Sequence, residues 1–232
     1  MEDLRRGAER MGERASDAIA MVKPKLRGVS HEWAFFLSLG FGVALIVLAR
    51  TPEATLAVAI YAVSLSALFG TSALYHRVNW TRPQVRQWMR RLDHSMIFFL
   101  IAGTYTPFAL LVLNGPLADA ILAVVWIGAI VGAVVEMIWI DHPKWVAAII
   151  YLALGWVAVA AFPGLWSEMG VAGALLVAFG GLLYTAGAVV YATQRPNPSP
   201  AVFGYHEVFH LLVIAAAVAH FSAVAFFALP QA

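Results

Sequence analysis

Seven apolar runs separated by short polar breaks constrain this chain more than any other feature of its sequence. About 20 apolar residues suffice for one helix to cross a bilayer. The composition agrees, because 62% of the residues are hydrophobic and 12% are charged, whereas a soluble domain has about 25% charged residues. We therefore predict an all-α integral membrane protein, a bundle of seven transmembrane helices at approximately 32–49, 54–76, 93–113, 117–140, 145–162, 172–192 and 204–228.

The distribution of lysine and arginine predicts how this bundle is oriented. Of the 15 such residues, fourteen fall on one side of the predicted membrane and only Arg50 falls on the other. Cytoplasmic loops carry an excess of Lys and Arg. We therefore place the N-terminus in the cytoplasm and the C-terminus outside, in a multi-pass protein of the cell (inner or plasma) membrane. With six or eight helices, loops rich in lysine and arginine would no longer alternate with loops that lack them.

The segment 1–30 differs in composition from the transmembrane domain at 31–232. It is too charged to contain the apolar region of a cleavable signal peptide. Its apolar residues recur at spacings of three and four, which indicates an amphipathic helix at the membrane surface. A frayed basic tail is the alternative. The chain has no cysteine, so thiolate metal ligands and disulfides are excluded.

Ionisable side chains gather at three of the predicted helix ends. An ionisable group at a helix centre costs roughly 2.5–3.5 kcal/mol on insertion scales, so each one needs a reason. His76 ends the second helix, Asp93 begins the third, and His206 and His210 begin the seventh. The predicted topology puts all of them at the same depth, just inside the cytoplasmic leaflet. We therefore expect them to form one site.

The residue types at this site indicate a zinc centre. His206 and His210 lie one helical turn apart on one face, and we expect His76 to be the third imidazole ligand. Three neutral nitrogens leave zinc an open fourth position for water, whose pKa zinc lowers to about 7. We assign catalytic roles to two neighbours: Asp93 accepts a hydrogen bond or a proton from the water, and Ser72 orients the water or donates to a developing oxyanion.

Simpler interpretations exist for these two neighbours. Asp93 is instead an ion-pair partner of Arg90 or Arg91 in one alternative. In another, the Ser72 hydroxyl bonds back to the carbonyl of Leu68.

Other polar residues are expected to lie outside the metal centre. His94 is about 100° round the helix from Asp93 and is expected to be supporting or structural. His220 lies about 15 Å from His210 along the helix axis and cannot share the metal. Glu136 is expected to pair with a cytoplasmic arginine or a polar neighbour. His31 and His142 stand at helix ends with no visible partner.

Residues 206–210 also match the H-E-x-x-H pattern of zinc proteases, in which Glu207 would be the base that activates water. Five residues with three fixed are a weak signal. A protease would also need a third ligand and a cleft for an extended substrate, and neither is evident. In the alternative, Glu207 faces the basic cytoplasmic surface.

Four stretches together carry a resemblance to a known family. They are KPKLRGVSHEWAFF at 23–36, SALYHR at 72–77, LDHSMIFFLIAGTYTPF at 92–108 and RPNPSPAVFGYHEVFHLLVIAAAVAHF at 195–221. The chain resembles the hemolysin III family, the bacterial branch of the progestin and adiponectin receptor superfamily, to which alkaline ceramidases are more distantly similar. The resemblance implies seven transmembrane helices, a cytoplasmic N-terminus and a zinc ion on His76, His206 and His210, with Asp93 and Ser72 beside it. The long extensions of the animal receptors are absent, so hormone sensing does not carry over.

Two main functions follow as hypotheses. The first is a zinc-dependent, ceramidase-like hydrolase of a lipid amide or ester in the inner leaflet. The second is a non-enzymatic sensor or membrane-homeostasis protein in which zinc is structural, with Asp93 as a direct fourth ligand. A cytolysin is less attractive, because a seven-helix protein is not released as a soluble pore-former. The expected partners are membrane lipids and no nucleic acid, and Fe(II) or Mn(II) would accept similar ligands less typically.

Overall fold

The computed structural model describes residues 23–232, and these residues form helices joined by turns and short loops, with no strand among them. Most of the segment 1–30, with its predicted amphipathic helix, therefore lies outside the described residues. The last residues form a π-helical turn, Val224–Ala228, and a short 3₁₀ turn, Leu229–Gln231. The α-helices are α2 (Val29–Leu48), α3 (Pro52–Arg77), α4 (Pro83–Leu111), α5 (Pro116–Ile138), α6 (Lys144–Gly155), α7 (Ala158–Thr193) and α8 (Tyr205–Ala223).

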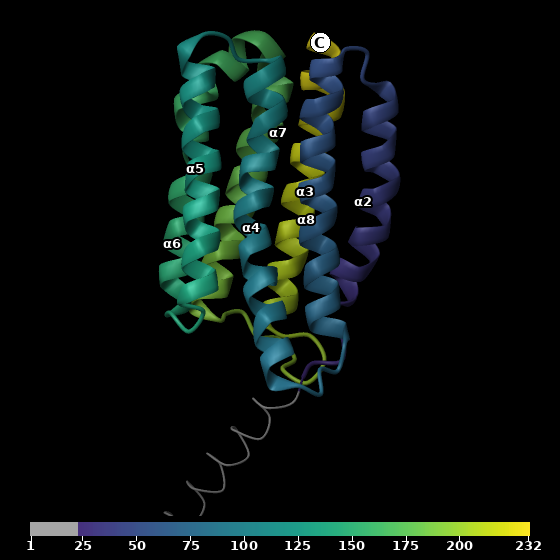
Figure 1. Ribbon diagram of the computed structural model, residues 1–232, viewed down its shortest axis with the longest axis vertical. Helices are drawn as coiled ribbons and strands as arrows, with labels where there is room; N and C mark the ends of the chain where they lie inside the picture. The colour runs from purple at the N-terminus through teal and green to yellow at the C-terminus, as the bar shows by residue number, and fades with distance from the viewer. Residues whose placement is uncertain (1–22) are drawn as a thin grey trace, which may run out of the picture.

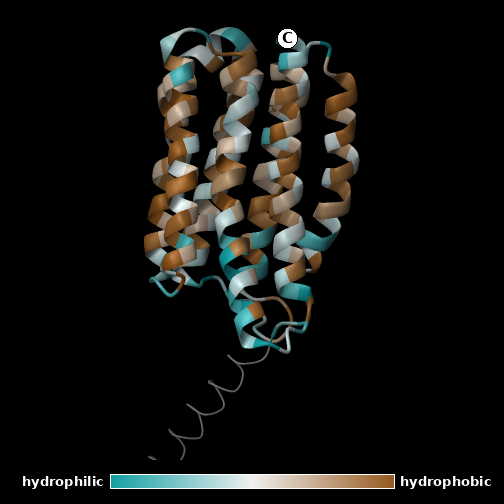
Figure 2. Cartoon of the chain, in the orientation of Figure 1, coloured by the Kyte–Doolittle hydropathy of each residue, from teal (hydrophilic) through white to brown (hydrophobic). Residues whose placement is uncertain are grey.

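Prolines mark the start of three of these helices, α3, α4 and α5. Proline suits the first helical position because its ring presets φ and it lacks an N–H that would have no partner there. At α3, Thr51 adds an N-cap, since its hydroxyl accepts a hydrogen bond of 3.1 Å from the Ala54 N–H. Helix α4 begins ten residues before the predicted apolar run, and its hydrophilic first turns project from the apolar part of the bundle (Figure 2).

The region from α6 to α7 agrees only in part with the predicted runs 145–162 and 172–192, because α6 ends at Gly155, inside the first run, although Gly170 lies in the predicted gap. Pro163 lies inside α7 and does not end it, and the break in helical geometry falls instead at Gly170, where φ is 69° and ψ is 179°. Glycine adopts a positive φ without the steric cost that a Cβ brings. The described residues contain six stretches long and apolar enough to cross a membrane, and one of these is the 50-residue stretch Lys144–Thr193. The count of seven crossings stays a prediction.

The helices pack side by side along the long axis of the molecule (Figure 1). Helix α3 packs between α2 and α4, α4 also packs against α5, and α8 packs mainly against α7. Large apolar side chains cover the outside of the bundle, and Val47, Ile138 and Phe226 expose 70% or more of their surface. Contiguous exposed apolar surface on this scale suits contact with lipid rather than water. The chain is an all-helical membrane protein.

One glycine positions the end of the bundle that carries the polar residues. Gly28, just before α2, has φ of 79°, and a Cβ built there would lie 2.6 Å from the Cβ of His76. The segment before α2 also pairs with the loop before α8, because the Lys25 and Leu26 N–H groups donate to the Ala201 and Val202 carbonyls at 3.1 and 3.2 Å. The starts of α2 and α8 and the end of α3 are thereby held together.

Candidate metal centre

Three histidines converge where the end of α3 meets the start of α8. His76 lies in the last turn of α3, and His206 and His210 lie in the first two turns of α8. One ligand nitrogen from each ring lies within 4.8 Å of the other two. His76 and His210 are buried and His206 is partly buried. The predicted convergence of these three residues is confirmed.

The spacing of these nitrogens fits a divalent cation. His206 Nε2 lies 3.1 Å from His76 Nε2. Two nitrogens bound 2.0–2.1 Å from a tetrahedral ion lie about 3.3 Å apart, so this pair needs little movement to share one. His210 Nδ1 is buried and makes no hydrogen bond within the described residues. Together the three rings form a donor set that can hold a metal ion.

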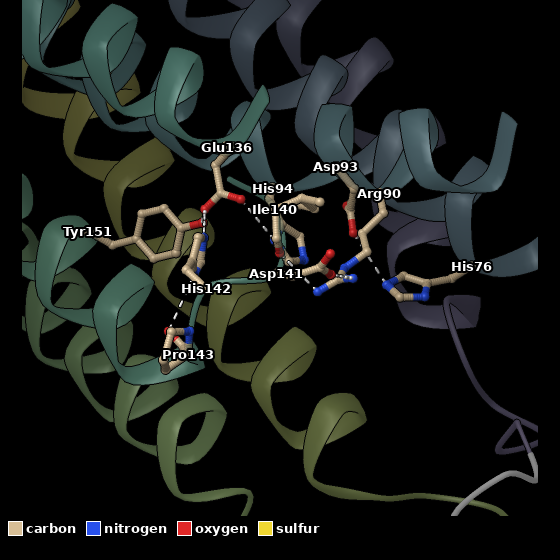
Figure 3. Close-up of polar contacts among 10 residues, drawn as sticks. All are labelled: His76, Arg90, Asp93, His94, Glu136, Ile140, Asp141, His142, Pro143 and Tyr151. Carbon is tan, nitrogen blue, oxygen red and sulfur yellow. Dashed lines mark hydrogen bonds and ion pairs between the residues drawn. The ribbon is translucent and has the colours of Figure 1, made fainter. Parts of the chain in front are cut away.

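Asp93 lies beside this centre, on the buried side of α4. Its Oδ2 is 3.5 Å from His76 Nε2 (Figure 3). The alternative pairing with Arg90 is not formed, because Arg90 instead donates to Asp141 Oδ1 at 3.0 Å and to the Ile140 carbonyl at 3.1 Å. Within residues 23–232, neither Arg90 nor Arg91 pairs with Asp93, and the carboxylate lies close to the histidines.

Ser72 lies one turn before His76 on the same face of α3 and is buried. It makes no hydrogen bond to the carbonyl of Leu68 within residues 23–232, so the simpler interpretation of this hydroxyl is not seen. The side chain instead lines a cavity next to the histidines.

This cavity has a volume of about 540 Å³ and walls that are mostly apolar. Its lining includes Ser72, Asp93, His206 and His210, and it extends along α8 as far as His220. Ten helical residues from His210 to His220 correspond to about 15 Å. Pockets that bind small molecules typically have about 300–1,000 Å³ and a few convergent polar groups in an apolar wall. The remaining wall is built largely from apolar residues that include Phe108, Phe162, Leu165 and Val213.

His31 was expected to have no partner, and the structure corrects this. Its ring stacks on that of His210, with centroids 3.7 Å apart and planes 9° apart. Both of its nitrogens are buried without a hydrogen bond in the described part of the chain. His31 therefore supports the ring of a candidate ligand. The sequence carried one hint, since His31 lies within one of the four stretches that resemble the family.

Glu207 is held away from a role in activating water. It is buried, its Oε1 accepts a hydrogen bond from Arg27, and its Oε2 accepts one of 2.7 Å from the Gly204 N–H. The second contact caps the start of α8. Oε1 thus joins α8 to Arg27 in the basic segment before α2, and Oε2 caps the start of α8 itself, so both carboxylate oxygens are engaged.

The other histidines lie outside the metal centre. His220 Nε2 is 3.0 Å from the Val177 carbonyl, well along α8 from the three converging rings. His94 and His142 both contact Glu136, which was expected to pair with an arginine or a polar neighbour. His142 therefore does have a partner, contrary to expectation.

Comparison with known proteins gives consistent matches over most of the chain. A family model described as "Haemolysin-III related" matches residues 19–221. The chain is 31% identical to Hemolysin-3 of Bacillus cereus over 226 residues, which cover 96% of this chain and 100% of that protein. It is 30% identical to a Hemolysin-3 homolog of Bacillus subtilis (strain 168) over 202 residues, or 86% of this chain and 91% of that one. It is 29% identical to the human monocyte to macrophage differentiation factor over 168 residues, which cover 71% of this chain and 67% of that protein.

Proposed function

The chain belongs to the haemolysin-III-related family, and we propose that it is a zinc-dependent hydrolase that cleaves a lipid amide or ester. One observation carries the proposal: His206, His210, Asp93 and Ser72 line a mostly apolar cavity of about 540 Å³, and His76 converges with the two histidines beside it. An apolar wall would bind the hydrocarbon part of a lipid, and the polar residues are the parts that hydrolysis needs.

Each residue has a role in this proposal. His76, His206 and His210 would hold the ion. Bound there, zinc would supply a Lewis acid and lower the pKa of water to about 7. Asp93, 3.5 Å from His76 Nε2, would orient the attacking water and accept its proton. The Ser72 hydroxyl would donate a hydrogen bond to the oxyanion that develops on the substrate carbonyl.

The same residues support a second candidate, a structural zinc without catalysis. His76 on α3 and His206 on α8 lie close enough to bind one ion, and Asp93 is close enough to this pair to become a fourth ligand. A closed four-ligand site would tie the helices together and leave no position for water. The two candidates differ in whether lipid is turned over.

Product release separates the two candidates. We expect purified protein, loaded with zinc and incubated with mixed phospholipids and sphingolipids, to release free fatty acid that mass spectrometry detects. The Asp93→Ala variant is the control and should release little, since it lacks the proton acceptor. Identical products from both proteins would remove support for the enzyme and favour the structural zinc.

We further propose that the chain crosses the cell membrane seven times with its N-terminus in the cytoplasm. The stretch Lys144–Thr193 has 50 residues. A continuous helix of that length would measure about 75 Å, more than twice the ~30 Å hydrocarbon core. Two crossings that meet near Gly170, where the backbone is not helical, account for this length. The metal centre then lies near the cytoplasmic face, as the lysine and arginine distribution indicates.

A labelling experiment checks this topology, and the lack of cysteine in the chain makes it simple. We expect a membrane-impermeant maleimide to label Ser167→Cys in intact cells, because two crossings put this residue at the outer surface. Thr81→Cys, in the loop between α3 and α4, should be labelled only after lysis. A single crossing would bury Ser167 at mid-membrane and leave its variant unlabelled under both conditions.

A further inference from the structure

A second buried polar group lies beside the metal centre and has no role in the proposed hydrolysis. Its centre is Glu136 on α5, which is 1% exposed. Glu136 Oε2 lies 3.3 Å from His94 Nδ1, and Oε1 lies 2.9 Å from His142 Nε2 and 3.1 Å from the Tyr151 hydroxyl (Figure 3). An ionisable group inside a membrane protein is costly and usually functional. No arginine in the described part of the chain pairs with this carboxylate, so its presence here needs an explanation.

The hydrogen bonds define which nitrogen of His94 carries the proton. A carboxylate can only accept hydrogen bonds, so His94 Nδ1 must donate to Glu136. In a neutral imidazole the other nitrogen, Nε2, then keeps a free lone pair. A carboxylate behind a histidine is the usual way in which proteins select one tautomer and fix the orientation of the ring.

The free nitrogen of His94 is on a ring that lines the lipid cavity, next to Asp93 in the chain. Nε2 makes no hydrogen bond within residues 23–232. It is also not fully buried, so a bound molecule can reach it. The remaining polar contacts of the group point elsewhere, because His142 Nδ1 lies 3.2 Å from the Pro143 carbonyl. His94 and Tyr151 both line the cavity, but the Tyr151 hydroxyl donates to Glu136, so His94 is the member of the group that offers an unused acceptor nitrogen there.

We propose that Glu136 is a positioning residue that holds His94 as a hydrogen-bond acceptor for the lipid in the cavity. The ligand class follows from the chemistry: a lipid with an N–H or O–H group in its polar part, such as a secondary amide. An ester or a tertiary amide without such a group gains nothing from the lone pair. The inference rests on the proposed function only in taking the ligand to be a lipid.

The tautomer of His94 can be measured without any substrate. In zinc-loaded full-length protein with ¹⁵N-labelled histidines, we expect His94 to be neutral and protonated at Nδ1. Its signals are assigned by their loss in His94→Gln. Glu136→Leu should change this tautomer, because leucine has no atom that accepts a hydrogen bond from Nδ1, whereas glutamine could still accept it through its amide oxygen. Tyr151→Phe is the matched control, since it removes a donor to Oε1 and leaves His94 on Oε2. A wild-type His94 that is protonated at Nε2 or at both nitrogens would overturn the proposal.

Binding of two probes tests the acceptor role. N-methylpalmitamide carries one N–H, and N,N-dimethylpalmitamide carries none. We expect the wild type to bind the first roughly 3- to 10-fold more tightly, the effect of one neutral hydrogen bond, and Glu136→Leu to lose this preference. Equal affinities in the wild type would overturn this role, even if the protein hydrolyses lipid. A preference that Glu136→Leu removes would support it, even if no lipid is hydrolysed.

Discussion

Replacing His206 with glutamine is expected to strip the divalent ion from the protein. His206 contributes one of only three imidazole nitrogens, and its Nε2 stands 3.1 Å from that of His76. Loss of a residue that merely supports a metal ligand typically costs 10- to 100-fold in affinity, so loss of a ligand should cost more than about 100-fold. Elemental analysis of protein purified without chelators, followed by competition with a zinc indicator, measures the change.

A buried histidine outside the site provides the control. His220→Gln removes an imidazole from the same helix, about 15 Å along its axis, and should leave about one ion per chain. Thermal stability gives a second readout, because zinc at 1,000 times its Kd stabilises a protein by about 4.1 kcal/mol. The wild type and His220→Gln should lose this stabilisation when a chelator removes the zinc. The thermal stability of His206→Gln should not change on chelation. Full metal content in His206→Gln would place the ion elsewhere.

Much of the metal centre could be predicted because polar residues are conspicuous in apolar helices. His76, Asp93, His206 and His210 interrupt apolar runs at helix ends, and alternating crossings bring those ends to one side. Because an ionisable group inside a membrane costs free energy, each of these residues was expected to have a partner, and this was enough to predict that they form one site. The structure confirms that the three histidines converge, and it places Asp93 and Ser72 beside them.

The contacts that were missed depend on the path of the loops. His31 meets His210 because Gly28 turns in the left-handed region against His76 and because the segment before α2 pairs with the loop before α8. No periodicity in the sequence encodes that pairing. His142 reaches Glu136, six residues earlier, only because α5 ends at Ile138 and the chain turns back.

The break in α7 lies in the predicted gap between the runs 145–162 and 172–192, at Gly170, but Pro163 does not cause it. Pro163-Gly164 predicts the end of a helix in a soluble protein, but membrane helices tolerate proline where neighbouring groups satisfy the freed carbonyl. The positive φ of Gly170 lies six residues beyond Gly164. Nothing in the sequence distinguishes Gly170 from the other glycines of α7.

Asp93→Asn is expected to slow lipid hydrolysis by about 10²- to 10⁴-fold, the usual contribution of a general base. Asparagine matches the size of aspartate but cannot take up a proton from water. The three histidines stay in place, so the metal content should not change. Fatty acid release from the lipid that gives product in the mixed-lipid assay measures the rate, and elemental analysis of the same sample measures the ion.

Glu207→Gln separates this mechanism from that of a zinc protease. Glu207 accepts hydrogen bonds from Arg27 and from the Gly204 N–H, and glutamine can keep only one of them by its single oxygen. Loss of a hydrogen bond to a charged group costs about 1.5–3 kcal/mol of stability, while the hydrolysis rate should stay within a few-fold of the wild type. The H-E-x-x-H mechanism predicts the reverse order, with Glu207→Gln inactive and Asp93→Asn active. The pair of variants therefore identifies the base, because Asp93 lies beside His76 while both oxygens of Glu207 are engaged elsewhere.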